Sequence, residues 1–230
     1  RMKLRIALLP LCLLATLPTL AATRGFEVRD MVALDRVSSP TLSPDGSVVV
    51  FAQRSMNKEA TKATTGLWMR NLLTRDMRPP SPLTPEGWSV NSPGFSADGK
   101  SVYFLSAKSG TQQLYAMPLS GGTPQQLTAF ALDIGSYRIS PDGKQIAFST
   151  ATFAECKADL ACTQKRLDDT SAKKSTGVVY DQLFVRHWDT WADGRRNRLF
   201  VADLPAAKAK PVAVAVSLTD SIDGDAPSKP

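Results

Sequence analysis

The hydrophobic and polar positions of the chain repeat in three places. Each repeat opens on a short polar turn, Ser-Pro-Asp-Gly or Ser-Ala-Asp-Gly, at residues 43–46, 96–99 and 140–143. An apolar run rich in β-branched and aromatic residues follows each turn, at residues 48–51, 102–104 and 146–148. Proline, aspartate and glycine suit successive positions of a type I turn that ends on a left-handed residue. Each turn therefore predicts a β-hairpin whose second strand is buried.

A second pair of strands is predicted in each repeat. Apolar positions mark residues 66–72, 113–119 and 198–204, and each unit ends on a Leu-Thr pair at 83–84, 127–128 and 218–219. Four short antiparallel strands in roughly 40 to 50 residues are typical of a propeller blade. A lipocalin-like barrel or a β-sandwich would not predict the same turn and the same ending three times. We therefore predict an all-β, incomplete β-propeller of about three four-stranded blades, at about 37–84, 91–128 and 135–219.

The third unit carries a long insertion, residues 151–197, between its second and third strands. Its first part, 155–177, is polar and lysine-rich, which is typical of a surface loop. Its second part, 178–198, is rich in aromatic residues, and long insertions in repeat proteins lie on one face, where binding often occurs. A propeller closes with about four to eight blades. We therefore expect residues 23–230 to be the N-terminal part of a longer propeller.

Residues 1–22 have the features of a secretory signal peptide. Three basic residues precede an apolar run at 6–17, and small residues suited to a signal peptidase follow at 19, 21 and 22. A membrane anchor is the alternative, but prolines interrupt the run, which is shorter than the roughly 20 residues that a spanning helix needs. A lipoprotein site at Cys12 would lack the small residues that precede such a cysteine. The sequence predicts an exported protein, periplasmic or secreted, without a membrane span after signal removal.

The charge balance narrows the choice of partners. The chain has 28 Lys and Arg against 21 Asp and Glu, a formal net charge of +7, and removal of the three basic signal residues leaves 25 − 21 = +4. Phosphate binding requires basic residues clustered on one face, and the chain shows no such run. We expect no nucleic-acid partner. The apolar content of 43% indicates a folded globular chain.

Cys156 and Cys162 are the cysteines that remain after the signal segment. Both lie in the polar part of the insertion, and an exported chain meets an oxidising compartment. A local disulfide is therefore predicted. The spacing of the two cysteines does not fit the usual zinc sites, and neither does the long sequence separation between them and His187, the single histidine. We expect no metal and no cofactor.

Individual side chains give weak signals for catalysis. His187 would need an activated serine and a buried carboxylate to act as a triad base, and no local signature supplies either. A hydrogen-bonded histidine packed beside Trp188 and Trp191 is the plainer interpretation, and lining of a cavity is the functional one. Four acidic residues of the insertion would suit a substrate ammonium, but their spacing selects none of residues 155, 159, 168 and 169.

The aspartates of the three turns recur and so resemble paired catalytic carboxylates. Their position in the turns indicates a different role, because aspartate in a turn accepts hydrogen bonds from the backbone just after it. We expect Asp45, Asp98 and Asp142 to cap their turns.

Two segments carry a resemblance to a known family. Residues 32–40, which lead into the first turn, and above all residues 180–204, with His-Trp-Asp-Thr-Trp-Ala-Asp-Gly-Arg at 187–195, resemble the prolyl oligopeptidase family of serine peptidases. Within the family they are most similar to the dipeptidyl-peptidase 5 and acylaminoacyl-peptidase branch. The resemblance covers essentially all of the chain after the signal segment. The turns are less specific than residues 180–204, because periplasmic TolB-type propellers share them.

The resemblance implies a two-domain enzyme. In this family an N-terminal propeller caps a C-terminal α/β-hydrolase domain with a Ser-Asp-His triad, and the propeller restricts the entry of oligopeptide substrates. No Gly-x-Ser-x-Gly elbow and no His-Gly-Gly oxyanion segment occur in the 230 residues. We therefore assign no catalytic residue in this chain and expect the hydrolase domain elsewhere in the full-length protein.

The expected contribution of this chain is substrate gating. We assign it to Tyr180, His187, Trp188 and Trp191, and expect these rings to face the propeller mouth, covered by the blades or by a partner. The alternative is a non-enzymatic TolB-type binding module. That type begins with a separate small domain, whereas the first hairpin here starts near Val37, which favours the peptidase.

Overall fold

The computed structural model describes residues 24–57, 59, 61–73, 78–175, 177–180, 183, 185–206, 209–222 and 224–227. The predicted signal peptide, residues 1–22, lies outside the described residues. The described chain contains three four-stranded antiparallel sheets. Their strands are β1 (Arg36–Leu42), β2 (Val48–Met56), β3 (Ala63–Asn71) and β4 (Ser81–Pro82); β5 (Val90–Phe95), β6 (Ser101–Ser106), β7 (Gln113–Pro118) and β8 (Gln125–Gln126); and β9 (Ser136–Ile139), β10 (Gln145–Phe153), β13 (Arg195–Asp203) and β14 (Val216–Ser217).

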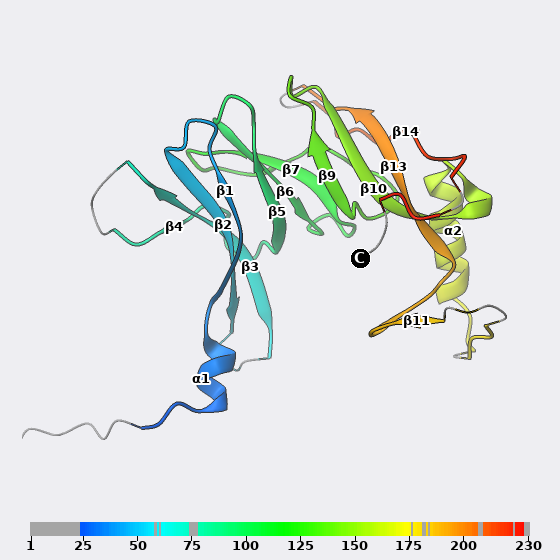
Figure 1. Ribbon diagram of the computed structural model, residues 1–230, viewed down its shortest axis with the longest axis horizontal. Coiled ribbons are helices and arrows are strands. Elements are labelled where there is room, and N and C mark those ends of the chain that lie inside the picture. Colours follow the sequence, from blue (N-terminus) through cyan, green and yellow to red (C-terminus); the bar gives the residue numbers. More distant parts are fainter. Residues whose placement is uncertain are drawn as a thin grey trace, which may run out of the picture.

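The three sheets stand side by side in a row (Figure 1). Strands that follow one another in the chain lie next to one another in each sheet, apart from a short two-stranded insertion in the third. Consecutive meanders of four antiparallel strands, packed face to face, are the blades of a β-propeller. The predicted fold class is confirmed.

The first predicted turn is closed by its aspartate. Asp45 Oδ1 accepts hydrogen bonds from the Ser43 hydroxyl at 2.6 Å and from the Ser47 amide at 3.0 Å. These bonds, the serine hydroxyl first, lower the pKa of Asp45 to about 2. Gly46 then adopts a φ of 70°, in the left-handed region that favours glycine.

The other two turns repeat this arrangement. Asp98 accepts from Ser96 and Lys100, and its pKa is lowered, with the Ser96 hydroxyl as the largest cause. Asp142 accepts from the matching serine and lysine of its own turn, and its pKa is also lowered. The capping role predicted for the turn aspartates is confirmed.

The recurring Leu-Thr pair has a structural cause. In each sheet the threonine hydroxyl accepts a hydrogen bond from the amide of a leucine in the third strand, at 2.9 Å or 3.0 Å. All three threonines are buried. Where the short fourth strand ends, the threonine hydroxyl thus serves as the acceptor in place of a backbone carbonyl. The leucine amide of the third strand therefore stays hydrogen-bonded. The pairs are Leu67 with Thr84, Leu114 with Thr128, and Leu199 with Thr219.

The residue before each of these leucines differs between the sheets. Gln113 is fully buried, and its side-chain amide donates to the carbonyls of Phe130 and Leu132, both at 3.1 Å. Arg198 stands at the same position of the third sheet, and its guanidinium donates to the Thr219 carbonyl at 2.7 Å. The first sheet has Gly66 there. Each of the two longer side chains therefore holds the segment that leaves its own blade.

Two separate apolar seams join the sheets. The first seam joins β2 and β3 to β6 and β7, and Trp88 packs edge-on against Phe104 and Tyr115, with ring centroids 6.1 Å and 5.1 Å apart. The second seam joins β6 and β7 to β10 and β13, where Phe148 stacks on Phe130 at 4.4 Å and on Phe200 at 5.6 Å. Burial of these large rings is the main source of stability for the row of sheets.

The insertion is shorter and more regular than the sequence indicates. Strand β10 continues through Phe153 and β13 begins at Arg195, so the insertion spans residues 154–194. The interpretation of 155–177 as an irregular surface loop is wrong, because this segment forms the 3-10 helix η1 (Ala154–Cys156) and the α-helix α2 (Leu160–Ser171). The Asp159 side chain caps α2 by accepting from the Cys162 amide at 3.0 Å.

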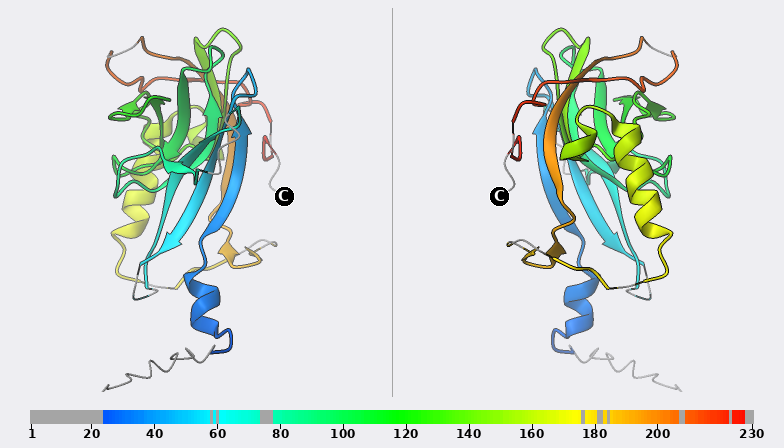
Figure 2. Two further views of the ribbon diagram at one scale, coloured as in Figure 1. Left: turned by 90° about the vertical axis from the view of Figure 1, so that its left-hand side faces the viewer. Right: turned by 90° about the vertical axis from the view of Figure 1, so that its right-hand side faces the viewer.

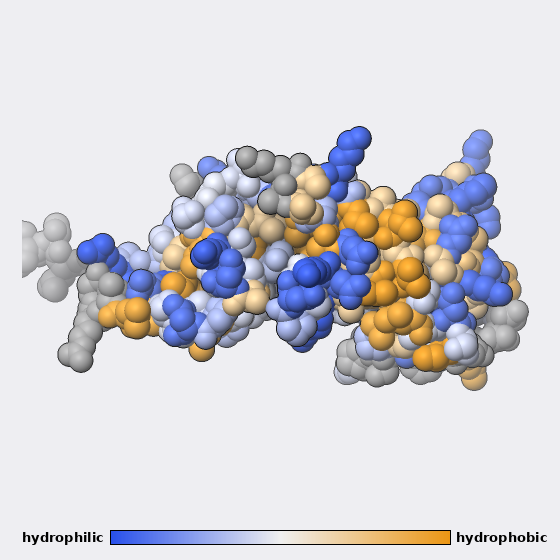
Figure 3. Space-filling view, turned by 90° about the horizontal axis from the view of Figure 1, so that it is seen from above, coloured by the Kyte–Doolittle hydropathy of each residue, from blue (hydrophilic) through white to orange (hydrophobic). Residues whose placement is uncertain are grey.

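The outer side of the third sheet is apolar and exposed. Half-buried Leu199 and Val201 of β13 lie near exposed residues of the segment that contains β14, namely Val214, Val216 and Leu218. Figure 3 shows apolar residues gathered over this part of the molecule. In the second seam the corresponding apolar faces are covered by a neighbouring sheet. The third sheet therefore presents a face of the kind that a further blade covers.

Candidate functional site

The candidate site lies at one end of the row of sheets. The helix α1 (Val28–Ala33) precedes β1, and the insertion follows β10, the second strand of its sheet. The start of a first strand and the end of a second antiparallel strand lie at the same end of a sheet. Figures 1 and 2 show α1 and the hairpin of β11 (Arg186–His187) and β12 (Thr190–Trp191) extending from this end.

The hairpin presents two tryptophans to solvent. Trp188 is 84% exposed and Trp191 is 58% exposed. Among the described residues, the hairpin forms a two-stranded sheet of its own that extends away from the three larger sheets (Figure 1). The blades of this chain therefore leave the two rings exposed, and the expectation that the rings face the propeller mouth and are covered there by a partner stays a prediction. Large exposed aromatic groups mark contact surfaces. The hairpin is therefore available to a partner or a ligand.

The turn that carries Trp188 is strained. His187 pairs with Thr190, so Trp188 and Asp189 form a two-residue hairpin loop. Trp188 has a φ of 52°, a left-handed conformation that glycine normally supplies at such a position. A non-glycine residue held there costs on the order of 1–3 kcal/mol. Strain at an exposed tryptophan is the pattern expected where the side chain is needed for contact.

A small aromatic and cationic cluster supports the hairpin. Tyr180 stacks on Trp191 with ring centroids 6.0 Å apart, and the Arg186 guanidinium lies 5.2 Å from the centre of the Trp191 ring. The structure thus brings two of the four predicted gating residues together. Arg186 had no sequence signal, because the role of an arginine that lies over an aromatic ring is visible only once the position of the ring is known.

The other two predicted gating residues are Trp188 and His187. Trp188 lies in the exposed turn between β11 and β12. The backbone of His187 pairs in β11, but its side chain lies outside what the structure describes. The packed histidine beside Trp188 and Trp191 therefore stays a prediction.

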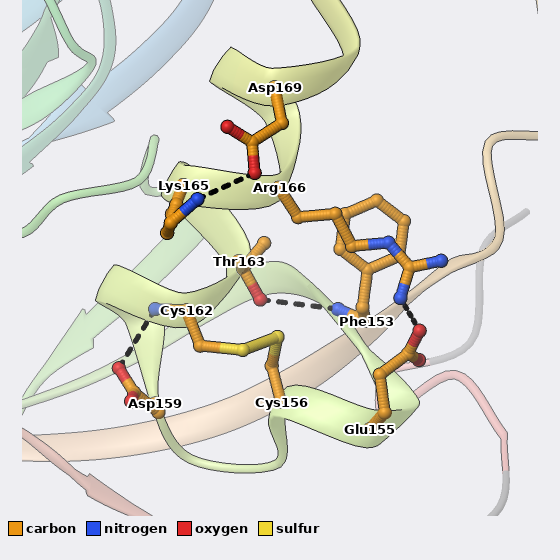
Figure 4. The surroundings of a disulfide bond; sticks show 9 residues. All are labelled: Phe153, Glu155, Cys156, Asp159, Cys162, Thr163, Lys165, Arg166 and Asp169. Atoms are coloured by element: carbon orange, nitrogen blue, oxygen red, sulfur yellow. Dashed lines mark hydrogen bonds and ion pairs between the residues drawn. A yellow bond between two sulfur atoms is a disulfide. The ribbon is translucent and has the colours of Figure 1, made fainter.

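The base of the insertion is fixed to the third sheet by several contacts (Figure 4). Cys156 of η1 and Cys162 of α2 are joined by a disulfide, with Cα atoms 5.6 Å apart. The Phe153 amide donates to the buried Thr163 hydroxyl at 3.3 Å. Arg166 lies 4.2 Å from the centre of the Phe153 ring and also pairs with Glu155.

These contacts give α2 a defined place beside β10. The disulfide closes a short loop and constrains the unfolded chain by about 2 kcal/mol in the chain-entropy model. The stacked and ion-paired arginine adds a second attachment one turn further along α2. The insertion thus leaves the sheet through a base that the disulfide and the Arg166 contacts attach to β10 and η1.

The helix α1 adds an apolar surface at the same end. Phe26, Val28, Met31 and Leu34 are each more than half exposed, and α1 has no buried residue. A short helix of this kind gains little stability from its own hydrogen bonds. An ion pair between Arg24 and Asp30 holds its first turn. The apolar side chains therefore face solvent at the end where the hairpin also extends.

Neither a metal-binding group nor a membrane-spanning helix is found among the described residues. No three His, Cys, Asp or Glu side chains come together there as a metal-binding group. No helix within the same residues has the length and apolar character needed to cross a membrane.

Curated proteins similar to this chain include dipeptidyl-peptidases. Dipeptidyl-peptidase 5 of Porphyromonas endodontalis is 27% identical over 201 residues, which cover 87% of this chain and 27% of that protein. Dipeptidyl-peptidase 5 of Porphyromonas gingivalis is 32% identical over 163 residues, which cover 70% of this chain and 22% of that protein. The chain therefore spans about a quarter of the length of these relatives. No protein-family model matches it.

The fold comparison agrees with the sequence relatives. The acylaminoacyl peptidase of Pyrococcus horikoshii superposes with a TM-score of 0.54 at 14% identity, over 81% of this chain and 26% of that one. At 14% identity this match shows the fold alone. The family is indicated by the dipeptidyl-peptidase relatives. Together they identify this chain as a propeller portion of the prolyl oligopeptidase family of serine peptidases.

Proposed function

We propose that this chain is the propeller portion of an exported serine exopeptidase of the dipeptidyl-peptidase or acylaminoacyl-peptidase type, and that it controls the entry of oligopeptides. In the intact enzyme a C-terminal α/β-hydrolase domain supplies the serine, histidine and aspartate for acyl transfer. This chain supplies the surface that peptides pass. The predicted signal peptide and the disulfide support export.

The observation that carries the proposal is the position of the exposed aromatic hairpin. Trp188 and Trp191 lie at the end of the blades where α1 also exposes its apolar side chains. A partner domain that covered this end would bury both sets of side chains, which removes the cost of exposing them to water. A peptide that approached a catalytic centre at this end would pass the hairpin, in which Tyr180 and Arg186 pack against Trp191.

The test compares substrates of different length in the intact protein. We expect Trp188→Ala combined with Trp191→Ala to raise kcat/KM for a ten-residue peptide relative to that for a dipeptidyl fluorogenic substrate by about tenfold, equivalent to ~1.4 kcal/mol. The short substrate should be little affected, because the hairpin holds no group that acts on the scissile bond. Leu73→Ala is the matched control, since Leu73 is 74% exposed beyond the opposite end of β3.

Two outcomes would count against the proposal in different ways. An unchanged ratio in a folded double variant would show that the hairpin does not gate entry. Absence of any peptidase activity in the intact wild-type protein would remove the enzyme reading altogether. That second result would favour the alternative, a non-enzymatic propeller of the TolB type that acts as an envelope binding module.

A further inference from the structure

A small open pocket, called the cavity below, lies between the second and third sheets, at the end that bears the insertion. Its volume is about 210 Å³, which is room for about seven water molecules at ~30 Å³ each. The linker between the two sheets, the end of β10, the start of β13 and helix α2 all contribute to its wall. These elements all belong to the described chain.

One buried polar atom without a partner belongs to a residue in the wall of this cavity. Among the described residues, four buried side-chain nitrogen or oxygen atoms lack a hydrogen-bond partner, and three of them belong to Thr150, Thr152 and Arg198. Thr150 and Arg198 lie opposite each other in the register of β10 and β13. Thr150 is 3% exposed and lines the cavity. A hydroxyl in this position is destabilising unless something in the cavity completes its hydrogen bonds.

The cavity wall carries one charge of each sign. Asp133, from the linker, accepts from the Gln112 amide at 2.6 Å through Oδ1, and no described residue pairs with its Oδ2. Arg195, from β13, binds Asp193 at 2.7 Å and 2.6 Å through Nε and Nη2, and no described residue pairs with its Nη1. Each side chain is therefore held in place by one partner and keeps hydrogen-bonding capacity for another.

We propose that this cavity binds a small zwitterion, a free α-amino acid or a dipeptide. The ammonium group pairs with Asp133, and the carboxylate pairs with Arg195. A ligand with one charge can pair with only one of these side chains, whereas a zwitterion can pair with both. Leu132 and Leu167 provide apolar contact for a short side chain, and the Thr150 hydroxyl gains a partner. The choice of a peptide as ligand rests on the proposed function, but the chemistry of the cavity does not.

The first test measures binding of L-alanyl-L-alanine to the intact protein by calorimetry. We expect Asp133→Asn and Arg195→Gln each to weaken binding about tenfold to a hundredfold, because each removes a charge-assisted hydrogen bond. Asparagine still accepts from the Gln112 amide, so the linker keeps its shape. N-acetylated and C-amidated forms of the dipeptide should weaken by a similar factor with the wild-type protein. Asp203→Asn and Arg196→Gln are matched controls on the same strand and should bind normally.

A second variant separates binding from folding. Thr150→Val removes the unpartnered hydroxyl and keeps the shape of the side chain. We expect it to raise the melting temperature of the ligand-free protein by about 2–4 °C and to weaken dipeptide binding severalfold. A purely structural threonine would not give these opposite signs.

The outcomes are decisive without reference to peptidase activity. Equal affinity in the wild type, Asp133→Asn and Arg195→Gln would place the dipeptide at another site and overturn the proposal. No binding of the dipeptide or of alanine at millimolar concentration would show that the cavity holds water alone. Binding that depends on both charges would support the proposal even in a protein without peptidase activity, so the two proposals fail independently.

Discussion

The threonine at the end of each blade can be tested by removal of its hydroxyl. Thr128 is fully buried; its Oγ1 accepts from the Leu114 amide at 2.9 Å and donates to Gln113 Oε1 at 2.8 Å. In Thr128→Val the buried Leu114 amide loses its acceptor, which costs about 1–3 kcal/mol. Gln113 Oε1 keeps its second donor, the Phe130 amide at 3.0 Å, so its loss is small. We expect a total loss of about 2–3 kcal/mol.

The assay is thermal unfolding of the intact protein followed by tryptophan fluorescence. A loss of this size lowers the melting temperature of the propeller by about 4–12 °C. Thr152→Val is the matched control, because Thr152 is also fully buried but its hydroxyl has no partner. That variant should be neutral or slightly more stable. Equal destabilisation by the two substitutions would refute the reasoning, since the volume change is the same and only the hydrogen bonds differ.

Two further predictions concern the turns and the insertion. The pKa of Asp45 is about 2 in the folded chain and about 3.9 in an unfolded one, so this group stabilises the fold above pH 4 and the contribution is lost as the pH falls towards 2. Asp45→Asn should therefore flatten the fall in melting temperature between pH 4 and 2, and an unchanged slope would contradict the turn-capping account. Thiol labelling of the denatured, unreduced exported protein should find no free thiol at Cys156 or Cys162, whereas two free thiols would refute the predicted disulfide.

The blades were predictable because their signals are local. The turn residues lie within a few positions of one another, and their hydrogen bonds join residues two to five apart in the sequence. The Leu-Thr ending was visible as a repeat. Its cause was not visible, because Leu114 and Thr128 meet only through the sheet register. Local chemistry therefore predicts the repeat, and the structure explains why the repeat is kept.

The helix α2 was missed because tertiary contacts support it. Its sequence is polar, with Leu160, Thr163 and Leu167 spaced along one side. A helix of twelve mostly polar residues is marginal in isolation. Here the Asp159 cap, the disulfide and the stacking of Arg166 on Phe153 hold it. A cap followed by residues at helical spacing was the signal available in the sequence.

The candidate site was predicted only in part. The aromatic content of the insertion correctly indicated an unusual segment, but composition cannot say whether rings are covered, and Trp188 proved to be exposed. The cavity between the second and third sheets had no sequence signal at all. Asp133, Thr150 and Arg195 come from a linker, a strand end and a strand start, and only the packing of two sheets brings them together.

The two seams have a consequence for the history and assembly of the repeat. In the first seam a tryptophan packs edge-on against a phenylalanine and a tyrosine. In the second seam three phenylalanine rings stack nearly parallel to one another. Blades that arose by copying would at first have been interchangeable, and any copy could have docked on any other. With dissimilar seams, a chain that skips or exchanges a blade while it folds leaves rings of the wrong shape in contact. Each blade thus recognises its proper neighbour, and the order of the blades in space is fixed by side chains as well as by connectivity.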